Sequence, residues 1–263
     1  MGIDVKSGPV TEAQIDEFER NGAICLRGLF DGEWIERLRV AIERVKIERH
    51  DTPGYHAETF MWQRDPDFRN FVFESPAANI AQALMRTKSV RFYFDHLFVK
   101  EPGAQQPSPW HHDLPYWPID GDQVCSIWLA LNHVTKASSG LEYVAGSHRW
   151  NRRFKPVPFG GGGAMIESPE EDVIPDINAN RDSYTLLNWD MEPGDCLVHH
   201  ALTIHGSGGN TTLHQRRRAL ATRWVGDDVV YAPGASTYEP LKDPTLRSGG
   251  PLASEKFPLV VEG

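Results

Sequence analysis

From about residue 89 onward the chain is built of short β-rich runs separated by clusters of Gly, Pro and Asn, and no other feature limits its fold more. Many short strands with turns between them are typical of a sandwich or a barrel. The sequence shows no internal repeat. We expect the strands to lie within Val90–Lys100, Val124–Val134, Tyr184–Leu187, Cys196–His205 and Arg217–Val225.

The residues before this β-rich part have a helical pattern. Thr11 followed by Gln14 forms a capping box, and Ile15 with Phe18 gives the apolar stripe of a helix over about residues 11–21. This is the first of three expected helices. The other two span about residues 31–50 and 79–88, and a short strand is expected at 23–27.

With 263 residues, 40% of them apolar, the chain can bury one sizeable core. We expect a single domain over residues 1–263, because all-β barrels of this length commonly form one unit. It would comprise a helical flank to about residue 88, a β core over about 89–231 and a tail over about 232–263. A long insert at about 150–183 contains Gly160–Gly163, which lacks the Lys-Ser/Thr of a phosphate loop and is interpreted as a loop, with a lid as one role.

The chain is acidic, with a net charge of −9. Such a surface repels phosphate backbones and anionic headgroups, and the basic run Arg216–Arg218 is too short to reverse this. We therefore expect a small-molecule substrate and no nucleic-acid or membrane partner, with the oligomeric state left open.

Residues 1–9 lack the apolar stretch of a secretory signal, and no apolar run is long enough to span a membrane. The three cysteines, Cys25, Cys125 and Cys196, are widely spaced among apolar residues, which indicates reduced thiols rather than a disulfide framework. These features predict a cytoplasmic protein.

The segment with the clearest chemical content contains His111, His112 and Asp113. In an extended strand, His111 and Asp113 would project from the same side and His112 from the other. An imidazole and a carboxylate so placed can bind one metal ion from adjacent corners. A distant histidine would complete a two-His-one-carboxylate face with open positions, which suits non-haem iron(II) holding a co-substrate and O₂.

Four later histidines could supply the third ligand: His199, His200, His205 and His214. If residues 196–205 form one strand, His199 and His205 lie roughly 20 Å apart and cannot share an ion. His205 directly precedes a Gly-rich turn and an arginine cluster, and a dicarboxylate co-substrate needs a cation for its far end. Both arguments favour His205.

An H-x-D triplet is a weak signal when it stands alone, because a surface turn with a salt-bridged histidine explains it equally well. A similar triplet, His56-Ala57-Glu58, lies in a segment without strand character, and we do not expect it to bind metal. The later histidine, glycine and arginine cluster is what favours the metal interpretation for His111 and Asp113.

The chain resembles the phytanoyl-CoA dioxygenase family of iron(II)/2-oxoglutarate-dependent oxygenases over most of its length. The resemblance implies a mainly β fold, a double-stranded β-helix or cupin-like jelly-roll barrel with N-terminal flanking helices and iron in the barrel mouth. It rests on these segments, in this order: GAICLRGLF (22–30), FVKEPG (98–103), WHHDLPYWP (110–118), IWLALNHVTKASSGLEYVAGSH (127–148), EPGDCLVHHALTIHGSGGN (192–210) and RRALATRW (217–224).

Carried over to this sequence, the resemblance implies His111, Asp113 and His205 as the iron ligands. It also implies that Ser207 helps to hold the co-substrate 2-oxoglutarate and that Trp128 lies near it. The implied cofactors and co-substrates are Fe(II), 2-oxoglutarate and O₂.

The arginine that anchors 2-oxoglutarate has two candidates. The family's usual spacing from the distal histidine leads to Arg216, whereas the strand motif Arg-x-Ala-Leu leads to Arg217. We favour Arg217, because loops absorb insertions more readily than strands do. It would share an inward face with Ala219 and Ala221. Lys100 is expected to be a surface lysine at a strand end.

The resemblance implies oxidation of a small organic molecule, with succinate and CO₂ as co-products. Halogenating relatives replace the carboxylate ligand, so Asp113 favours hydroxylation, desaturation or ring rearrangement. Three alternatives remain: a cupin-type metal enzyme that does not use 2-oxoglutarate, a non-catalytic jelly-roll ligand-binding module, and a zinc hydrolase with the same triad.

Overall fold

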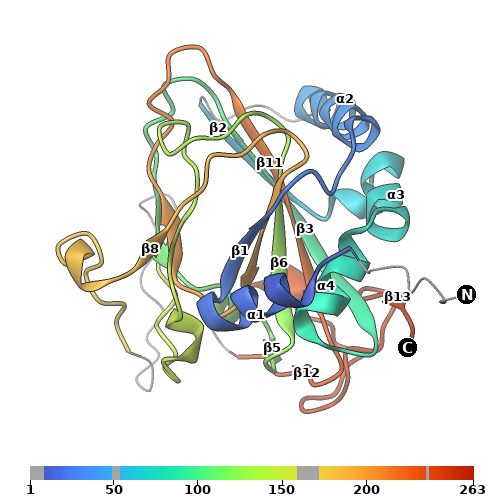
Figure 1. The fold of residues 1–263 in the computed structure, drawn as a ribbon. Helices are drawn as coiled ribbons and strands as arrows, with labels where there is room; N and C mark the ends of the chain where they lie inside the picture. The colour runs from blue at the N-terminus through green and yellow to red at the C-terminus, as the bar shows by residue number, and fades with distance from the viewer. Residues whose placement is uncertain (1–8, 49–53, 159–171, 235–236) are drawn as a thin grey trace, which may run out of the picture.

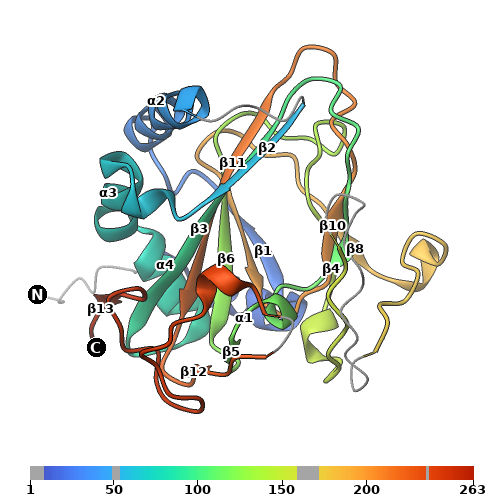
Figure 2. The same cartoon turned by 180° about the vertical axis from the view of Figure 1, so that it is seen from behind.

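The computed structural model describes residues 9–48, 54–158, 172–234 and 237–263. Two antiparallel sheets face each other and enclose the interior of a jelly-roll barrel, and the helices lie outside it (Figures 1 and 2). This is the mainly β barrel with flanking helices that the sequence predicts. Gly160–Gly163 and the centre of the 150–183 insert lie outside the described residues, so the lid interpretation and the division of the domain stay predictions.

The larger sheet forms the wall of the barrel next to the helices. Its strand order is β1 (Ala23–Leu26), β9 (Cys196–His200), β6 (Val124–Ala130), β11 (Arg217–Val225), β3 (Val90–Lys100) and β13 (Leu259–Val261), and β2 (Tyr55–Thr59) also pairs with β3. The smaller sheet forms the opposite wall. It contains β4 (Ser108–His111), β10 (His205–Ser207), β7 (Glu142–Val144) and β8 (Leu186–Leu187), and β5 (Ile119–Asp120) pairs separately with β12 (Val230–Tyr231).

Within the described residues, four α-helices cover the outer face of the larger sheet: α1 (Glu12–Asn21), α2 (Gly32–Glu48), α3 (Pro66–Glu74) and α4 (Ala77–Met85). The capping box of α1 is present, because the Thr11 hydroxyl accepts from the Gln14 backbone while the Gln14 side chain accepts from the Thr11 backbone. Helix α3 was not expected, although Asp65 caps it and Pro66 opens it, both of which are ordinary start signals. No helix in the described ranges is long and apolar enough to cross a membrane.

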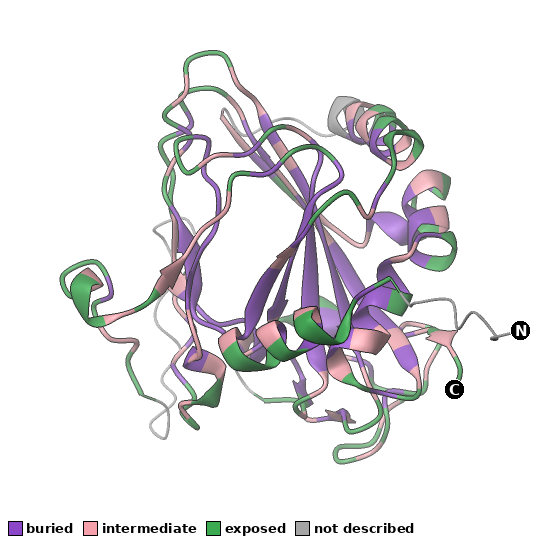
Figure 3. Ribbon diagram, in the orientation of Figure 1, coloured by how far each residue is buried: buried purple, intermediate pink, exposed green. Residues whose placement is uncertain are grey.

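Strand β11 lies between β6 and β3, and its side chains alternate between two very different environments. Leu220 and Trp224 face the helices and pack in the main apolar core with Leu97 and Leu129. The opposite side faces the barrel interior and carries polar and aromatic groups. Cross-strand neighbours on this inner side are Arg217 with Lys100, Ala219 with Phe98, Ala221 with His96 and Trp128, and Arg223 with Phe94 and Ser126. Figure 3 shows that the strands of both sheets are largely buried.

The single strand expected at Cys196–His205 is wrong. A turn at residues 201–204 separates β9 from β10 and sends them to opposite sheets. The turn is fixed by hydrogen bonds from the Thr203 backbone N–H to His200 and from the Ala201 N–H to Val124. The β-favouring residues of this stretch gave no sign of it, and one of the two partners that hold the turn, Val124, is distant in sequence.

Two other expectations fail where the sequence signal is weak. His56 and Glu58 lie on β2, so the triplet without strand character does form a strand, which pairs with the long β3. The C-terminal tail likewise contributes β13 to the edge of the larger sheet. Pairing to an existing edge can extend a segment whose own β propensity is low.

Candidate active site

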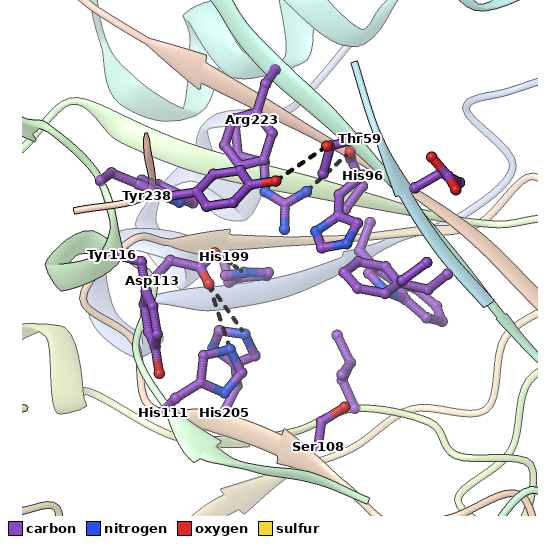
Figure 4. A pocket seen from close by; sticks show the side chains of 18 of the residues that line it. Thr59, His96, Ser108, His111, Asp113, Tyr116, His199, His205, Arg223 and Tyr238 are labelled. Carbon is purple, nitrogen blue, oxygen red and sulfur yellow. Dashed lines mark hydrogen bonds and ion pairs between the residues drawn. The ribbon is translucent and has the colours of Figure 1, made fainter. Parts of the chain in front are cut away.

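A cavity of about 520 Å³ lies between the two sheets, and the predicted metal ligands line it. His111 ends β4 and His205 begins β10, and the two residues are direct partners in the ladder of the smaller sheet. Figure 4 shows both rings directed towards Asp113. The His111 Nε2 atom lies 3.5 Å and the His205 Nε2 atom 3.9 Å from Asp113 Oδ1. One donor atom from each residue lies within 4.8 Å of the others.

The structure brings His111 and Asp113 together by a route other than strand alternation. Strand β4 ends at His111, and Asp113 has helical backbone angles of φ −76° and ψ −39° at the start of the 3₁₀ turn η2 (Leu114–Tyr116). The Asp113 backbone N–H donates to the Ala201 carbonyl over 2.8 Å. The turn between β9 and β10 therefore positions the carboxylate and also delivers His205.

The two histidine rings are oriented by their own main chain. Nδ1 of His111 lies 2.8 Å from the Pro109 carbonyl, and Nδ1 of His205 lies 2.9 Å from the Thr203 carbonyl. A carbonyl accepts only, so each Nδ1 carries the proton and each Nε2 presents a lone pair towards Asp113. Burial, together with nearby His111 and His199, holds the pKa of His205 well below its usual value, so its ring is neutral at pH 7.

The Asp113 carboxylate has one oxygen held by the protein and one directed to the histidines. Oδ2 accepts from the Ser126 hydroxyl over 3.1 Å and lies 3.4 Å from His199 Nε2, whose Nδ1 is 3.1 Å from the Tyr143 hydroxyl. Burial would raise the pKa of Asp113, but the hydrogen bonds and charges around it hold that pKa well below the usual range. The group is therefore a carboxylate at neutral pH.

His199 corrects the distance argument made from the sequence. Its ring centroid lies 4.4 Å from that of His205, not roughly 20 Å away, because the chain turns between them. His199 nevertheless uses both ring nitrogens on Asp113 and Tyr143, so it supports the carboxylate. Two imidazole nitrogens and one carboxylate oxygen facing a cavity form a donor set that suits a divalent transition metal such as iron(II).

Arg217 lies at another part of the cavity, at the start of β11, and its side chain is only 3% exposed. Its guanidinium carbon is 5.5 Å from the centroid of the Trp128 ring, which also lines the cavity. The Ser139 hydroxyl accepts from Arg217 over 3.3 Å and from the Lys100 ammonium over 2.8 Å, and it lies 3.1 Å from the Ser207 hydroxyl. Two cations and two hydroxyls therefore gather here.

Lys100 was expected at the surface, and that expectation is wrong. The side chain is 1% exposed and also donates to the Gly208 carbonyl over 3.1 Å. Asn210 closes the loop over it, with its amide donating to the Lys100, Glu101 and Gln215 carbonyls. Burial, with the neighbouring Arg217, lowers the pKa of Lys100 to about 7. Burial lowers the pKa of Arg217 to about 10.

Arg216 is placed differently from Arg217. Its guanidinium binds Glu101 over 2.7 Å and Glu43 over 3.0 Å, and it does not line the cavity. Of the two candidate anchors, only Arg217 faces the cavity that the metal triad lines. Two further residues escaped the sequence analysis. Ser139 has a positive φ of 72° in the run Lys-Ala-Ser-Ser-Gly, and Arg223 is a second buried cavity arginine on β11.

A jelly-roll barrel whose mouth collects two histidines and an aspartate beside a buried arginine places the chain in the class of double-stranded β-helix metal proteins. The model of the phytanoyl-CoA dioxygenase family matches residues 18–219. The chain therefore belongs to the phytanoyl-CoA dioxygenase family of iron(II)/2-oxoglutarate-dependent oxygenases.

The similar proteins agree with this placement. "Probable phytanoyl-CoA dioxygenase" of Caenorhabditis elegans is 32% identical over 122 residues, which cover 46% of this chain and 37% of that protein. The match thus spans little more than a third of that relative. "Multifunctional dioxygenase prhA" of Penicillium brasilianum is 25% identical over 252 residues, 86% of this chain and 75% of that protein.

Two solved structures show the same fold. The non-heme alpha ketoglutarate dependent carbocyclase SnoK from nogalamycin biosynthesis has a TM-score of 0.76 and 22% identity, with 97% of this chain and 99% of that one covered. EctD from S. alaskensis, solved with 2-oxoglutarate and 5-hydroxyectoine, has a TM-score of 0.71 and 17% identity, with 99% and 90% covered.

Proposed function

We propose that this protein is an oxygenase that binds iron(II) through His111, Asp113 and His205 and uses 2-oxoglutarate to oxidise a small organic molecule. The observation that carries the proposal is the convergence of the two Nε2 atoms and Asp113 Oδ1 on a cavity that also contains buried Arg217. Iron bound there would supply O₂ activation coupled to decarboxylation of 2-oxoglutarate to succinate and CO₂.

Arg217 is the proposed anchor for the far carboxylate of 2-oxoglutarate. A buried guanidinium without a protein carboxylate is costly, and a bound dicarboxylate would compensate it. Ser139 and Ser207 present hydroxyls beside it, and Lys100 adds a second donor. Trp128 lies against the guanidinium and fixes its orientation. Arg216 is bound by two glutamates and is not proposed for this role.

The remaining cavity residues would bind the substrate and keep water away. Tyr116, Trp117, Phe94 and Phe98 give the cavity aromatic walls. Asp113 supplies a carboxylate where a halogenating site would need an open position, which argues against halogenation. Among hydroxylation, desaturation and ring rearrangement, we propose hydroxylation as the reaction. The three cysteines are free thiols, which supports a reducing compartment such as the cytoplasm.

The proposal is tested by anaerobic titration of iron-loaded protein with 2-oxoglutarate, followed by the metal-to-ligand charge-transfer absorption, and by succinate release in air. His205→Ala is expected to abolish both signals, and Arg217→Leu to weaken 2-oxoglutarate binding. Arg216→Leu is the matched control, because it removes the neighbouring guanidinium outside the cavity.

The alternatives give different results. A metal enzyme that does not use 2-oxoglutarate would be indifferent to Arg217→Leu, and a non-catalytic binding module would bind neither iron nor 2-oxoglutarate. Either result would reject the proposal.

A further inference from the structure

Arg223 is the second buried guanidinium of the cavity, and the residue is 6% exposed. Asp113 and Asp95 favour its charge from a distance, but no carboxylate of the described residues forms an ion pair with it. Its Nη1 donates to the Ala221 carbonyl over 3.3 Å, and its Nε has no hydrogen-bond partner. Arginine is almost never fully buried without a partner, so the missing anion calls for an explanation.

Aromatic rings surround this guanidinium. Its central carbon lies 4.7 Å from the Phe94 ring centroid and 5.9 Å from the centroids of Phe98 and Trp117. Stacking on rings fixes the side chain and leaves the planar edge, where the N–H groups lie, available for a ligand. Figure 4 shows the guanidinium projecting into the pocket between Tyr238 and His96.

The nearby carboxylates are already engaged. Asp95 points to the other side of β3, where it accepts from the Met61 and Trp62 backbone N–H groups over 2.7 Å each. Asp113 binds Ser126 and His199 through Oδ2 and faces the metal position through Oδ1. Glu58 lines the cavity but pairs with Arg64 over 3.3 Å.

The charges inside the cavity also favour an additional anion at Arg223. In the proposed complex, the two charges of iron(II) and the charge of Arg217 are balanced by Asp113 and the two carboxylates of 2-oxoglutarate. The charge of Arg223 is then opposed only by Asp95, which lies on the other side of β3 and binds backbone N–H groups there, and protonated Lys100 would add positive charge to the cavity. Burial, together with Arg223, keeps the pKa of His96 well below its usual value, so this ring is a neutral neighbour.

The co-substrate cannot be the missing anion at both arginines. Arg217 and Arg223 lie six residues apart on the same face of β11, roughly 20 Å along an extended strand. Hydroxyls and Lys100 surround Arg217, whereas Arg223 lies opposite Ser126, the residue that holds Asp113. An anion bound to Arg223 would therefore lie on the triad side of the cavity.

We infer that Arg223 binds an acidic group of the substrate, and that the substrate is an organic acid with an apolar body. The inference rests on the proposed function for the position of the metal and of 2-oxoglutarate. Phe94 and Trp117 would contact the apolar part. Tyr238, whose hydroxyl lies 3.5 Å from the Thr59 hydroxyl, offers a further hydrogen bond at the same part of the cavity.

The test uses Mn(II)-loaded protein saturated with 2-oxoglutarate, so that carboxylates cannot compete for Arg217. The probes are 3-phenylpropanoate and octanoate, each compared by calorimetry with its uncharged primary amide. We expect at least one acid to bind roughly 10-fold tighter than its amide, as a charge-assisted hydrogen bond provides. Arg223→Leu should remove that preference, and Arg223→Lys should retain part of it. Arg69→Leu is the control, because Arg69 also lies over aromatic rings but is exposed on α3.

Two results would overturn the inference: wild-type protein that binds both acids no better than the amides, or an acid preference that survives in Arg223→Leu. If Arg223 only supports Asp113, the leucine variant will lose Mn(II) affinity with no acid preference to lose. Failure of wild-type protein to bind 2-oxoglutarate would instead count against the proposed function. The acid and amide comparison is then repeated without 2-oxoglutarate in the Arg217→Leu background, where Arg217 cannot bind the acids and the preference still decides the role of Arg223.

Discussion

The two buried arginines of β11 face one cavity from similar strand positions, yet their surroundings differ sharply. Arg217 lies among hydroxyls and beside Lys100, all provided by loops and strand ends that fold over it. Arg223 lies among the rings of Phe94, Phe98 and Trp117 and has no hydroxyl partner, although the Nε atom lacks a hydrogen bond in both arginines. The hydroxyls and two cations around Arg217 suit a dicarboxylate. The guanidinium of Arg223, surrounded by aromatic rings, suits an acid whose remaining part is apolar. Under the proposed function and the further inference, Arg217 marks the end of the cavity that binds 2-oxoglutarate and Arg223 the end that binds the substrate.

The metal triad lines the cavity that both arginines face, and removing one of its ligands should have the largest effect. His205→Ala takes away one of two imidazole donors, so we expect metal affinity and succinate release to fall by more than ~100-fold. Metal content after dialysis and succinate production measure this. Near-normal metal content in the variant would contradict the ligand assignment, and His214→Ala, a substitution away from the triad, serves as the control.

The sharpest contrast between the two ends comes from matched leucine substitutions. Arg217→Leu should weaken 2-oxoglutarate binding by roughly 10- to 100-fold, because it removes a charge-assisted hydrogen-bonding group. Arg223→Leu should leave that affinity within about 2-fold, since hydrogen-bonding effects of distant groups are small. Anaerobic titration of both variants measures this. Equal losses in the two would show that the ends are not separate.

A smaller effect is expected for Ser126→Ala, and it should act on metal affinity rather than on one end of the cavity. This substitution removes the hydroxyl that donates to Asp113 Oδ2. Groups that orient a metal ligand typically affect metal affinity by about 10-fold or more. Competition with a metal chelator measures the change. Unaltered metal affinity would mean that His199 and the Ala201 carbonyl position Asp113 without help.

The smallest expected effect is a pH dependence confined to the Arg217 end. Because the pKa of Lys100 is lowered to about 7, its ammonium form is present below that pH and is lost above it. We expect 2-oxoglutarate binding to weaken by roughly 3-fold between about pH 6 and about pH 8, and Lys100→Met to remove this slope. Acid binding at Arg223 should show no such slope, because a guanidinium stays charged in this range. Titrations of Mn(II)-loaded protein in both pH conditions decide this.

The predictable part of the molecule is the part encoded by local pattern. The capping box of α1, the long strands β3 and β11 and the identities of the clustered His111, Asp113 and His205 could all be read from the sequence. The three residues were predicted correctly as a cluster, but the chain brings them together by turns that the sequence argument did not include. Asp113 reaches the histidines through a turn, and residues 201–204 change the direction of the chain where a continuous strand was expected.

Two buried cations, Lys100 and Arg223, escaped prediction for different reasons. Lys100 ends a strand and has the ordinary appearance of a surface lysine, but β2 and the loop held by Asn210 cover it. Arg223 lies on the same face of β11 as Arg217, so the alternation that placed Arg217 inward applies to Arg223 as well and could have found it. For Lys100, only the closed barrel buries the ammonium, and no pattern within its own segment shows this.

Each metal-facing histidine takes its ring orientation from a carbonyl two residues earlier in its own segment, Pro109 for His111 and Thr203 for His205. The backbone thus sets the alignment of these rings, and Tyr116 and Tyr143 pack beside them. Phe94 and Trp117 contribute no hydrogen bond to either ring among the described residues, so substitutions there should leave the ring orientation unchanged. A barrel organised in this way can acquire new substrates by substitution of the side chains that line its cavity, while the metal site and its chemistry stay constant.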